Sequence, residues 1–339
     1  MSERAPTLED VAREAGVSRA TVSRVVNGVR NVAPDIQEVV RRAIERTGYR
    51  PNRAARFLVT HRTETVALVI SGTGDAFAAR VFADPFFGRV VNGVVSCLRA
   101  RAMHPVILVA ESESARRQVV DYLSQGTADG ALVVTMQAAD PLAAMLTATK
   151  IPTVVFGRPE PGLDVSYVDL RQADGARLAA GHLLARGCRR IATVCGPRAL
   201  PAARERLEGF RTALAAAGVG EVPVAEGTFT VDSGAAAMSR LLAEHPDIDG
   251  VFAANDMMAH GACQLLRERG KRVPQDVAVV GFDDSSVAVA YRPFLTTVRQ
   301  PVEQMAGEMA GLLAEHIQGT RTEPTAVFFA PELVVRDSA

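Results

Sequence analysis

The sequence contains few of the residues that build a covalent or metal-bound framework. Four of its 339 residues are cysteines, at positions 97, 188, 195 and 263, and no two of them form a C-x-x-C pair. The six histidines are scattered, without an H-x-x-x-H pair. This pattern argues against a disulfide framework and a metal site, so we expect reduced thiols in a cytoplasmic protein that carries no metal and no cofactor.

Long apolar runs and enzyme motifs are missing as well. The longest apolar runs are about strand length, well short of the ~20 residues that a membrane-spanning helix needs. The N-terminus is charged and polar, unlike a secretory signal. The chain has no G-x-S-x-G, no P-loop and no H-E-x-x-H, and its only lysines are Lys150 and Lys271. We therefore expect a protein without a membrane partner, without catalytic residues and without enzyme activity.

The charge is distributed unevenly along the chain. The formal net charge is zero, but residues 1–62 contain 12 arginines against 7 acidic residues, a net charge of +5, which leaves −5 for the remainder. A basic head on an acidic body is typical of a nucleic-acid-binding module joined to a domain with another task.

Residues 7–27 predict two short helices joined by a tight turn. Thr7 is a good N-cap with Asp10 three residues later, Gly16 is a natural helix end, and Ser18 caps the second helix. The outer face of the second helix carries arginines beside short polar groups. This combination suits a helix in a DNA major groove, because arginine can donate two hydrogen bonds to guanine. A small helical bundle with a solvated polar face would give the same pattern.

The string V-S-x-x-T-V-S-R-V-V-N at residues 17–27 resembles a signature of the lactose-repressor (LacI/GalR) family of bacterial transcription regulators, and the resemblance extends over nearly the whole chain. A helix-turn-helix is moderately specific by itself, and the resemblance strengthens the DNA-binding interpretation. It implies that the helix pair contacts operator DNA through Thr7, Ser18, Arg19, Ala20, Thr21, Ser23, Arg24 and Asn27.

Residues 51–62 would be a plain linker on composition alone. The resemblance implies instead a hinge helix that folds on DNA and pairs with its twin in a homodimer on a palindromic operator. Leu58 would enter the minor groove and kink the duplex, while Arg53 and Arg56 would contact phosphates. The family's tetramers carry a further C-terminal helix, which does not follow the last predicted strand, so we expect a dimer.

From residue 65 onward, apolar strand-like runs alternate with amphipathic helices, which predicts an α/β fold with parallel sheets covered on both faces. The resemblance implies the architecture: a helix-turn-helix DNA-binding domain, a hinge segment, and an effector-binding and dimerisation core that is periplasmic-binding-protein-like and has two doubly wound α/β lobes. The domains are placed at 1–50, 51–62 and 63–339, with lobe one at about 65–160 and 297–321 and lobe two at about 164–292 and 325–339. The chain would then cross between lobes near residues 160–164, 292–296 and 321–325. The stretch 72–83 is longer than usual for its turn, and its role is not predicted.

An effector cleft is implied between the lobes. Asp283 ends a predicted strand, and open parallel sheets bind ligands at the carboxyl ends of their strands. In the family the matching aspartate accepts hydrogen bonds from sugar hydroxyls. Arg206 lies in an R-x-x-G-F motif, and Asn255 and Asp256 match an A-N-D motif in which the asparagine binds effector and the aspartate caps a helix. The full set of implied effector-binding residues is Phe86, Phe87, Arg158, Arg206, Phe229, Asn255 and Asp283.

Several alternatives stay open. The phenylalanines fit a hydrophobic core as well as a ligand contact, Gly157 removes an acceptor that many relatives have beside Arg158, and Arg171-Gln172 replaces their usual Asp-Asn. The polar residues suit a sugar or sugar derivative, whereas aromatic stacking suits a nucleobase or nucleoside. A solute-binding protein would share the core but would have no use for residues 1–58. The sequence thus favours a DNA-binding repressor controlled allosterically by a small-molecule effector, with a carbohydrate as the leading candidate.

Overall fold

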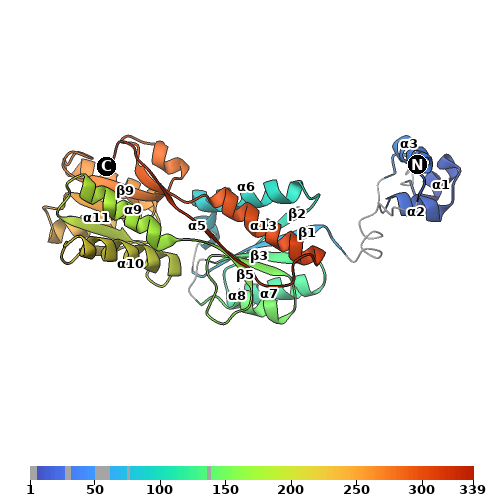
Figure 1. Ribbon diagram of the computed structural model, residues 1–339, viewed down its shortest axis with the longest axis horizontal. Helices are drawn as coiled ribbons and strands as arrows, with labels where there is room; N and C mark the ends of the chain where they lie inside the picture. The colour runs from blue at the N-terminus through green and yellow to red at the C-terminus, as the bar shows by residue number, and fades with distance from the viewer. Residues whose placement is uncertain (1–5, 27–31, 50–61, 75–76, 136–138) are drawn as a thin grey trace. The chain divides into compact units, whose positions relative to one another are not determined.

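The computed structural model describes residues 6–26, 32–49, 62–74, 77–135 and 139–339 (Figure 1). The chain forms two compact units that divide between Thr63 and Glu64. Within the described residues, no single helix is long and apolar enough to cross a membrane. One helix pair bent by 73°, Phe77–Ala83 with Pro85–Arg99, meets the length and composition requirement only when both helices are taken together.

The described part of the first unit consists of three helices, α1 (Leu8–Ala15), α2 (Arg19–Val26) and α3 (Pro34–Thr47). The predicted helix starts are confirmed. The Asp10 carboxylate accepts hydrogen bonds from the Thr7 amide at 2.9 Å and the Thr7 hydroxyl at 2.8 Å. The Ser18 hydroxyl accepts from the Thr21 amide at 3.1 Å. The helices bury one small core, formed by Val11, Val22, Val40, Ala43 and Tyr49.

The described residues of the second unit form two six-stranded sheets, one in each lobe. The lobe-one sheet has the order β11-β5-β4-β3-β1-β2 and is parallel throughout. Its strands are β1 (Thr65–Ser71), β2 (His104–Ala110), β3 (Gly130–Thr135), β4 (Thr153–Phe156), β5 (Ser166–Leu170) and β11 (Ala326–Phe329). The lobe-two sheet has the order β12-β10-β9-β8-β6-β7, with only β12 antiparallel. Its strands are β6 (Ile191–Cys195), β7 (Val224–Glu226), β8 (Gly250–Ala253), β9 (Ala278–Asp283), β10 (Thr296–Arg299) and β12 (Glu332–Val334).

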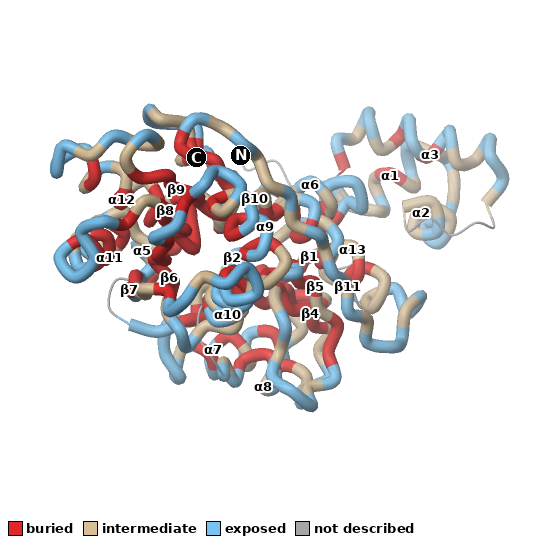
Figure 2. Tube along the Cα trace, turned by 60° about the vertical axis from the view of Figure 1, so that its left-hand side comes forward, coloured by how far each residue is buried: buried red, intermediate tan, exposed pale blue. Residues whose placement is uncertain are grey.

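Helices cover both faces of each sheet, as the alternation of strands and helices predicts. The helices of lobe one are α5 (Phe77–Ala83), α6 (Pro85–Arg99), α7 (Glu113–Ser124), α8 (Leu142–Ala148) and α13 (Val302–Gln318). Those of lobe two are α9 (Gln172–Ala185), α10 (Pro201–Ala216), α11 (Val231–Glu244), α12 (Asp256–Glu268) and the short 3-10 helix η1 (Ser286–Val289). In lobe one α6 and α13 pack together on one face and α7 and α8 on the other (Figure 1). The central strands are buried between these layers, whereas the edge strands β2, β11 and β12 are partly exposed (Figure 2).

The chain crosses between the lobes three times, and each crossing lies one strand later than predicted. The crossings follow β5, β10 and β11, at residues 171, 300–301 and 330–331. The lobe boundaries placed at 160–164, 292–296 and 321–325 are therefore wrong by one strand each. β5 (SYVDL) and β10 (TTVR) are short and carry polar residues, so they do not stand out as buried strands. The unassigned stretch 72–83 contains α5.

The contact between α6 and α13 generates a prediction about Gly93. A Cβ atom at Gly93 would lie 2.3 Å from the Glu303 carbonyl oxygen and 2.8 Å from Ala306 Cβ. We expect Gly93→Ala to lower the free energy of unfolding by about 1–3 kcal/mol, because the two helices must move apart. Urea unfolding measures this change.

Gly88→Ala is the matched control, since Gly88 lies on the same helix and a Cβ atom added there would meet no other atom within 4 Å. It should stabilise by roughly 0.5–1 kcal/mol through helix propensity. Equal effects of the two substitutions would contradict the close-packing argument.

Candidate functional site

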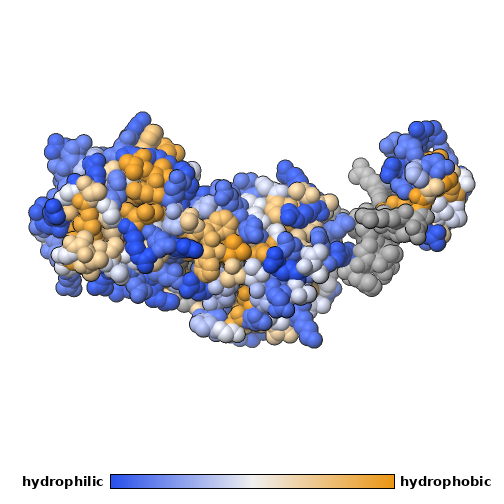
Figure 3. Space-filling model, in the orientation of Figure 1, coloured by the Kyte–Doolittle hydropathy of each residue, from blue (hydrophilic) through white to orange (hydrophobic). Residues whose placement is uncertain are grey.

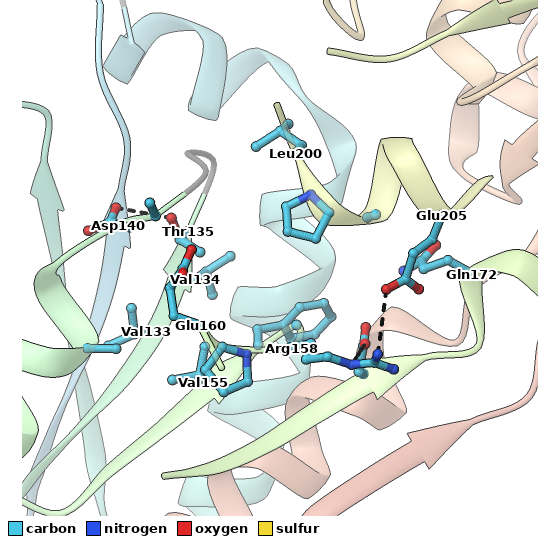
Figure 4. A pocket seen from close by; sticks show the side chains of 18 of the residues that line it. Val133, Val134, Thr135, Asp140, Val155, Arg158, Glu160, Gln172, Leu200 and Glu205 are labelled. Carbon is cyan, nitrogen blue, oxygen red and sulfur yellow. Dashed lines mark hydrogen bonds and ion pairs between the residues drawn. The ribbon is translucent and has the colours of Figure 1, made fainter. Parts of the chain in front are cut away.

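A cavity of about 340 Å³ lies between the two lobes, where strands of both sheets end (Figure 4). Lobe one contributes the start of α6 and the segments that follow β3, β4 and β5. Lobe two contributes the start of α10 and the segments that follow β8 and β9, together with Phe229 before α11. Gln172, which begins α9 directly after the first crossing, and Gln300, in the second crossing, also line it.

Six of the seven residues predicted to contact an effector line this cavity, and they come from segments far apart in the sequence. They are Phe86, Arg158, Arg206, Phe229, Asn255 and Asp283. Phe87 is the exception. It is 5% exposed and belongs to the hydrophobic core, so its predicted effector contact is corrected. Neighbouring residues on a helix point about 100° apart, and only Phe86 of the pair faces the cavity.

Arg206 is buried at the junction of the lobes. Its Nε atom donates to Gln172 Oε1 at 2.8 Å, and its Nη2 atom donates to Gln300 Oε1 at 3.1 Å. Nη1 donates to the Ala254 carbonyl at 2.6 Å and lies 3.6 Å from Asp283 Oδ1. Arg206 thus lines the cavity and also donates hydrogen bonds to Gln172 and Gln300, which lie at two of the crossings between the lobes.

Asp283 ends β9 with a backbone φ of +106°, a conformation that side-chain-bearing residues rarely adopt. Such strain costs on the order of 1–3 kcal/mol and is common at functional sites. Burial raises the pKa of Asp283, and the positive charges of Arg206 and Arg89 only partly oppose this. A buried carboxylate with a raised pKa gains free energy from a ligand that donates hydrogen bonds to it.

The A-N-D motif divides its roles differently from the prediction. Asn255, not Asp256, caps α12, because its Oδ1 accepts from the Met258 amide at 2.9 Å. Asp256 is fully buried, where one carboxylate oxygen accepts from Thr297 Oγ1 at 2.6 Å and the other from the Ser285 amide at 2.7 Å. It fixes the loop after β9 to β10. The cap role predicted for Asp256 is therefore wrong.

Phe229 is held in place by backbone contacts. The Asn255 side chain donates to the Phe229 carbonyl at 3.1 Å, which supports a φ of +64° at Phe229. The ring lies against the backbone of Gly196, where a Cβ would come within 2.3 Å of it. Phe229 both lines the cavity and packs on the lobe-two core, so the two alternatives left open for it are compatible.

Arg158 lies at the side of the cavity and is half exposed. Its guanidinium is 3.8 Å from Glu205 (Figure 4). It also lies 3.9 Å from Asp169. Asp169 lies near the end of β5 and is 5% exposed, and burial raises its pKa to about 6. The neighbouring Gly157 has a φ of +89°, which explains a glycine at this position.

The sequence reasoning missed a polar cluster on the lobe-one side. Asp140 lies 3.2 Å from the guanidinium of Arg116, and both side chains are buried. Asp140 also accepts from Thr135 Oγ1 at 3.0 Å (Figure 4). The only signal in the sequence was an acidic residue after a buried strand, which is weak because the partner Arg116 lies on α7. Among the described residues no group of three or more His, Cys, Asp or Glu is arranged to hold a metal.

The ionisable residues that line the cavity are mainly acidic. Six carboxylates face two guanidinium groups, those of Arg158 and Arg206. The six acidic residues are Asp84, Asp140, Glu160, Asp169, Glu205 and Asp283. This potential disfavours anionic ligands and suits an uncharged ligand that donates many hydrogen bonds.

In the first unit, α2 presents the predicted DNA-contacting groups on its outer side. The exposed residues among them are Ser18, Arg19, Ala20 and Arg24, and the partly exposed ones are Thr21 and Ser23. Val22, by contrast, is buried. Arg19 Nη1 lies 3.1 Å from Glu9 on α1. Thr7 is partly buried beside Asp10. The predicted contacts Asn27, Arg53, Arg56 and Leu58 lie outside the described residues.

A two-lobed core with a cavity at its strand ends, in one chain with a helix-turn-helix unit, defines a ligand-binding DNA-binding protein. Residues 7–52 match the family model for "Bacterial regulatory proteins, lacI family". Residues 180–339 match the model for a "Periplasmic binding protein-like domain". The transcriptional regulator CelR of Thermobifida fusca is 47% identical over 339 residues, covering 99% of this chain and 98% of that protein. The repressor PurR of Haemophilus influenzae strain PittEE is 31% identical over 340 residues, covering 98% of both.

Two solved structures are similar along the whole chain. A complex of the transcriptional regulator CelR with cellobiose has a TM-score of 0.78 at 45% identity and covers 98% of this chain and 100% of that one. The Lac repressor dimer bound to operator and the anti-inducer ONPF has a TM-score of 0.83 at 27% identity and covers 99% of both. The chain belongs to the lacI family of bacterial regulatory proteins. It is a DNA-binding transcriptional regulator and not an enzyme.

The raised pKa of Asp169 predicts a pH-dependent stability. Because the folded-state pKa is about 6 against an ordinary value of 3.8, ionisation of Asp169 opposes folding, and this penalty grows as the pH rises from about 4 to about 6. We expect Asp169→Asn to raise the free energy of unfolding at pH 8 by about 1–3 kcal/mol and to change it little at pH 4.

Denaturant unfolding at both pH values measures the effect. Asp164→Asn, at an exposed acid in the loop before β5, is the control and should be neutral at both. Destabilisation by Asp169→Asn at pH 8 would show that the carboxylate contributes favourably through Arg158 instead.

Proposed function

We propose that this regulator is a homodimeric repressor whose affinity for a palindromic operator is controlled by a neutral sugar or sugar derivative bound between the two lobes. The operator is contacted by α2 and by the hinge segment, and the protein acts in the cytoplasm, where its DNA target is. Effector binding changes the relative population of two arrangements of the lobes, and operator affinity changes with it.

The observation that carries the effector proposal is the charge of the cavity. Six carboxylates and two guanidinium groups line it. A sugar hydroxyl can donate to a carboxylate and accept from a guanidinium at the same time, so a neutral sugar satisfies both kinds of group. A sugar phosphate or a nucleotide would place its negative charge beside several acidic side chains. The solved complex of the similar regulator CelR holds cellobiose, which makes this disaccharide the first compound to test.

A nucleobase is the second candidate, and two observations favour it. Phe86 from lobe one and Phe229 from lobe two both line the cavity, and aromatic rings can stack on a base. The relative PurR is similar over 98% of the chain. Phe86, however, already packs edge-on against Phe87 and Phe156 at centroid distances of 5.2 and 5.5 Å. Phe86 therefore packs against two other rings of lobe one as well as lining the cavity.

Two observations support the dimer proposal. Apolar residues are exposed on lobe two, and the similar Lac repressor is a dimer in its complex with operator. Val289 is 48% exposed, Tyr291 58% and Val335 59%. The surface is mostly hydrophilic, with apolar patches on both lobes (Figure 3). A dimer gives two half-site contacts, which a palindromic operator requires for useful specificity.

The effector proposal is tested with Asp283→Asn. The amide keeps the shape of the side chain but loses an acceptor and the charge. We expect cellobiose at a hundred times its dissociation constant to stabilise the wild type by about 2.7 kcal/mol. Asp283→Asn should lose most of this stabilisation, as measured by thermal unfolding against neutral sugars, sugar phosphates, nucleobases and nucleosides.

Asp232→Asn, at an acid on lobe two that does not line the cavity, is the matched control and should respond like the wild type. A sugar phosphate that stabilises more than the parent sugar would contradict the charge argument. A nucleobase hit that survives Asp283→Asn would favour the second candidate.

The DNA-binding proposal is tested at Arg24, on the outer side of α2. We expect Arg24→Ala to relax base preference at one symmetric pair of operator positions, by about 1–3 kcal/mol of discrimination. Selection of binding sites from a random DNA library measures this. Arg42→Ala on α3, which removes the same charge, should weaken all sequences equally. If Arg24→Ala also weakened all sequences equally, Arg24 would be a phosphate contact.

A further inference from the structure

Arg89 of lobe one donates hydrogen bonds to residues on both sides of the lobe junction. Its Nε and Nη2 atoms donate to the two carboxylate oxygens of Glu303 at 2.7 and 2.8 Å. Its Nη1 atom donates to the backbone carbonyl of Asp283 at 2.8 Å, and Nη2 also donates to the Gln300 carbonyl at 3.0 Å. Glu303 belongs to the first turn of α13 in lobe one, whereas Asp283 ends β9 in lobe two.

The carbonyl that Arg89 holds belongs to the residue whose carboxylate faces the cavity. Asp283 has the strained φ of +106°, so its peptide group needs outside contacts to keep its orientation. The backbone amide of Ser285, two residues after Asp283, donates to the Asp256 carboxylate. Arg299 Nε donates to the Asp284 carboxylate at 2.8 Å. These contacts come from lobe two. Arg89 supplies the contact from lobe one.

Arg89 is built for this contact and not for binding the effector directly. Its side chain is 17% exposed, and it is not among the residues that line the cavity. The Glu303 carboxylate fixes the guanidinium on one side, and the hydrogen bond from Arg89 lowers the pKa of Glu303. The other side of the guanidinium then donates to the backbone carbonyls of Asp283 and Gln300. A lysine could not reproduce this, because its donors radiate from one nitrogen.

We propose that Arg89 is a positioning residue for the effector site: it orients Asp283 from the opposite lobe, and through it lobe one responds to effector bound at Asp283. This rests on the proposed function, in which the Asp283 carboxylate accepts hydrogen bonds from a sugar. A ligand that pulls on the carboxylate shifts the peptide group, and the rigid pair of Arg89 and Glu303 transmits the shift to α6 and α13.

The test uses the full-length protein with the substitutions Arg89→Met and Arg89→Lys and with cellobiose as the probe. Arg89→Met removes every hydrogen bond to the Asp283 carbonyl from lobe one, so it should weaken cellobiose binding by about tenfold or more in calorimetric titration, as the loss of a charge-assisted hydrogen bond predicts. Arg89→Lys should keep part of the affinity. Arg117→Met, which removes an exposed arginine on α7 of the same lobe, is the matched control and should bind like the wild type.

A double substitution separates positioning from general damage. If Arg89 acts through Asp283, Arg89→Met should weaken binding little further when Asp283→Asn is already present. Additive losses, or wild-type affinity in Arg89→Met, would overturn the proposal. Thermal unfolding of each variant without ligand shows whether it is folded.

Hydrogen exchange without any ligand provides an independent arm. Arg89→Met should speed amide exchange in residues 283–286 relative to the wild type and to Arg117→Met, because the loop after β9 loses its lobe-one contact. Equal exchange in all three proteins would overturn the positioning role. If cellobiose does not bind the wild type, or if Asp283→Asn leaves its binding unchanged, the proposed effector site fails, and the exchange measurement still decides the role of Arg89.

Discussion

The two-lobed core depends on one buried guanidinium group. Arg206 is 6% exposed, and removing a charged group from water is costly unless its hydrogen bonds are replaced. Its partners come from Gln172 and Gln300 at two crossings and from the strand ends of lobe two, and its guanidinium lies 3.6 Å from the Phe282 ring centroid. Burial lowers the pKa of Arg206, but arginine's ordinary pKa is so high that the group stays charged. Because the same side chain lines the cavity, a ligand that changes its contacts also acts on the connections between lobes.

Local features of the fold could be predicted from the sequence, whereas pairings over long distances could not. The caps at Thr7 and Ser18 depend on residues three positions away, and both are found where expected. The sheet to which β5, β10 or β11 belongs depends on pairing with strands from distant segments of the chain. The predicted lobe boundaries are wrong at these three strands. The same holds for the site. Motifs identified Arg206 and Asp283, but Arg89 and Asp140 became visible only through partners on other elements, such as Glu303 and Arg116.

The departures from the family pattern can now be interpreted physically. Arg171-Gln172 replaces the Asp-Asn pair that is usual in the family, so the sequence alone does not predict the contacts between the lobes at this position. Gln172 is 4% exposed and its side-chain oxygen accepts from Arg206 at 2.8 Å, so this position still supplies an acceptor at the junction. Gly157 lacks a side-chain acceptor, yet the nearby cavity wall contains Asp169 and Glu160. The acceptors of this cavity therefore come from different positions than the resemblance alone suggests.

The concentration of acids in the cavity links ligand choice to protonation. Burial raises the pKa values of Asp84, Asp169 and Asp283, which means that the ionised forms are poorly solvated when the cavity holds no ligand. Under the proposed function, a ligand that donates hydroxyl hydrogens to Asp283 favours its ionised form, so binding would release a proton from this group. An anionic ligand would have the opposite effect and would require proton uptake. In the proposed site, the burial of the carboxyl groups and their number would therefore both disfavour an anionic ligand.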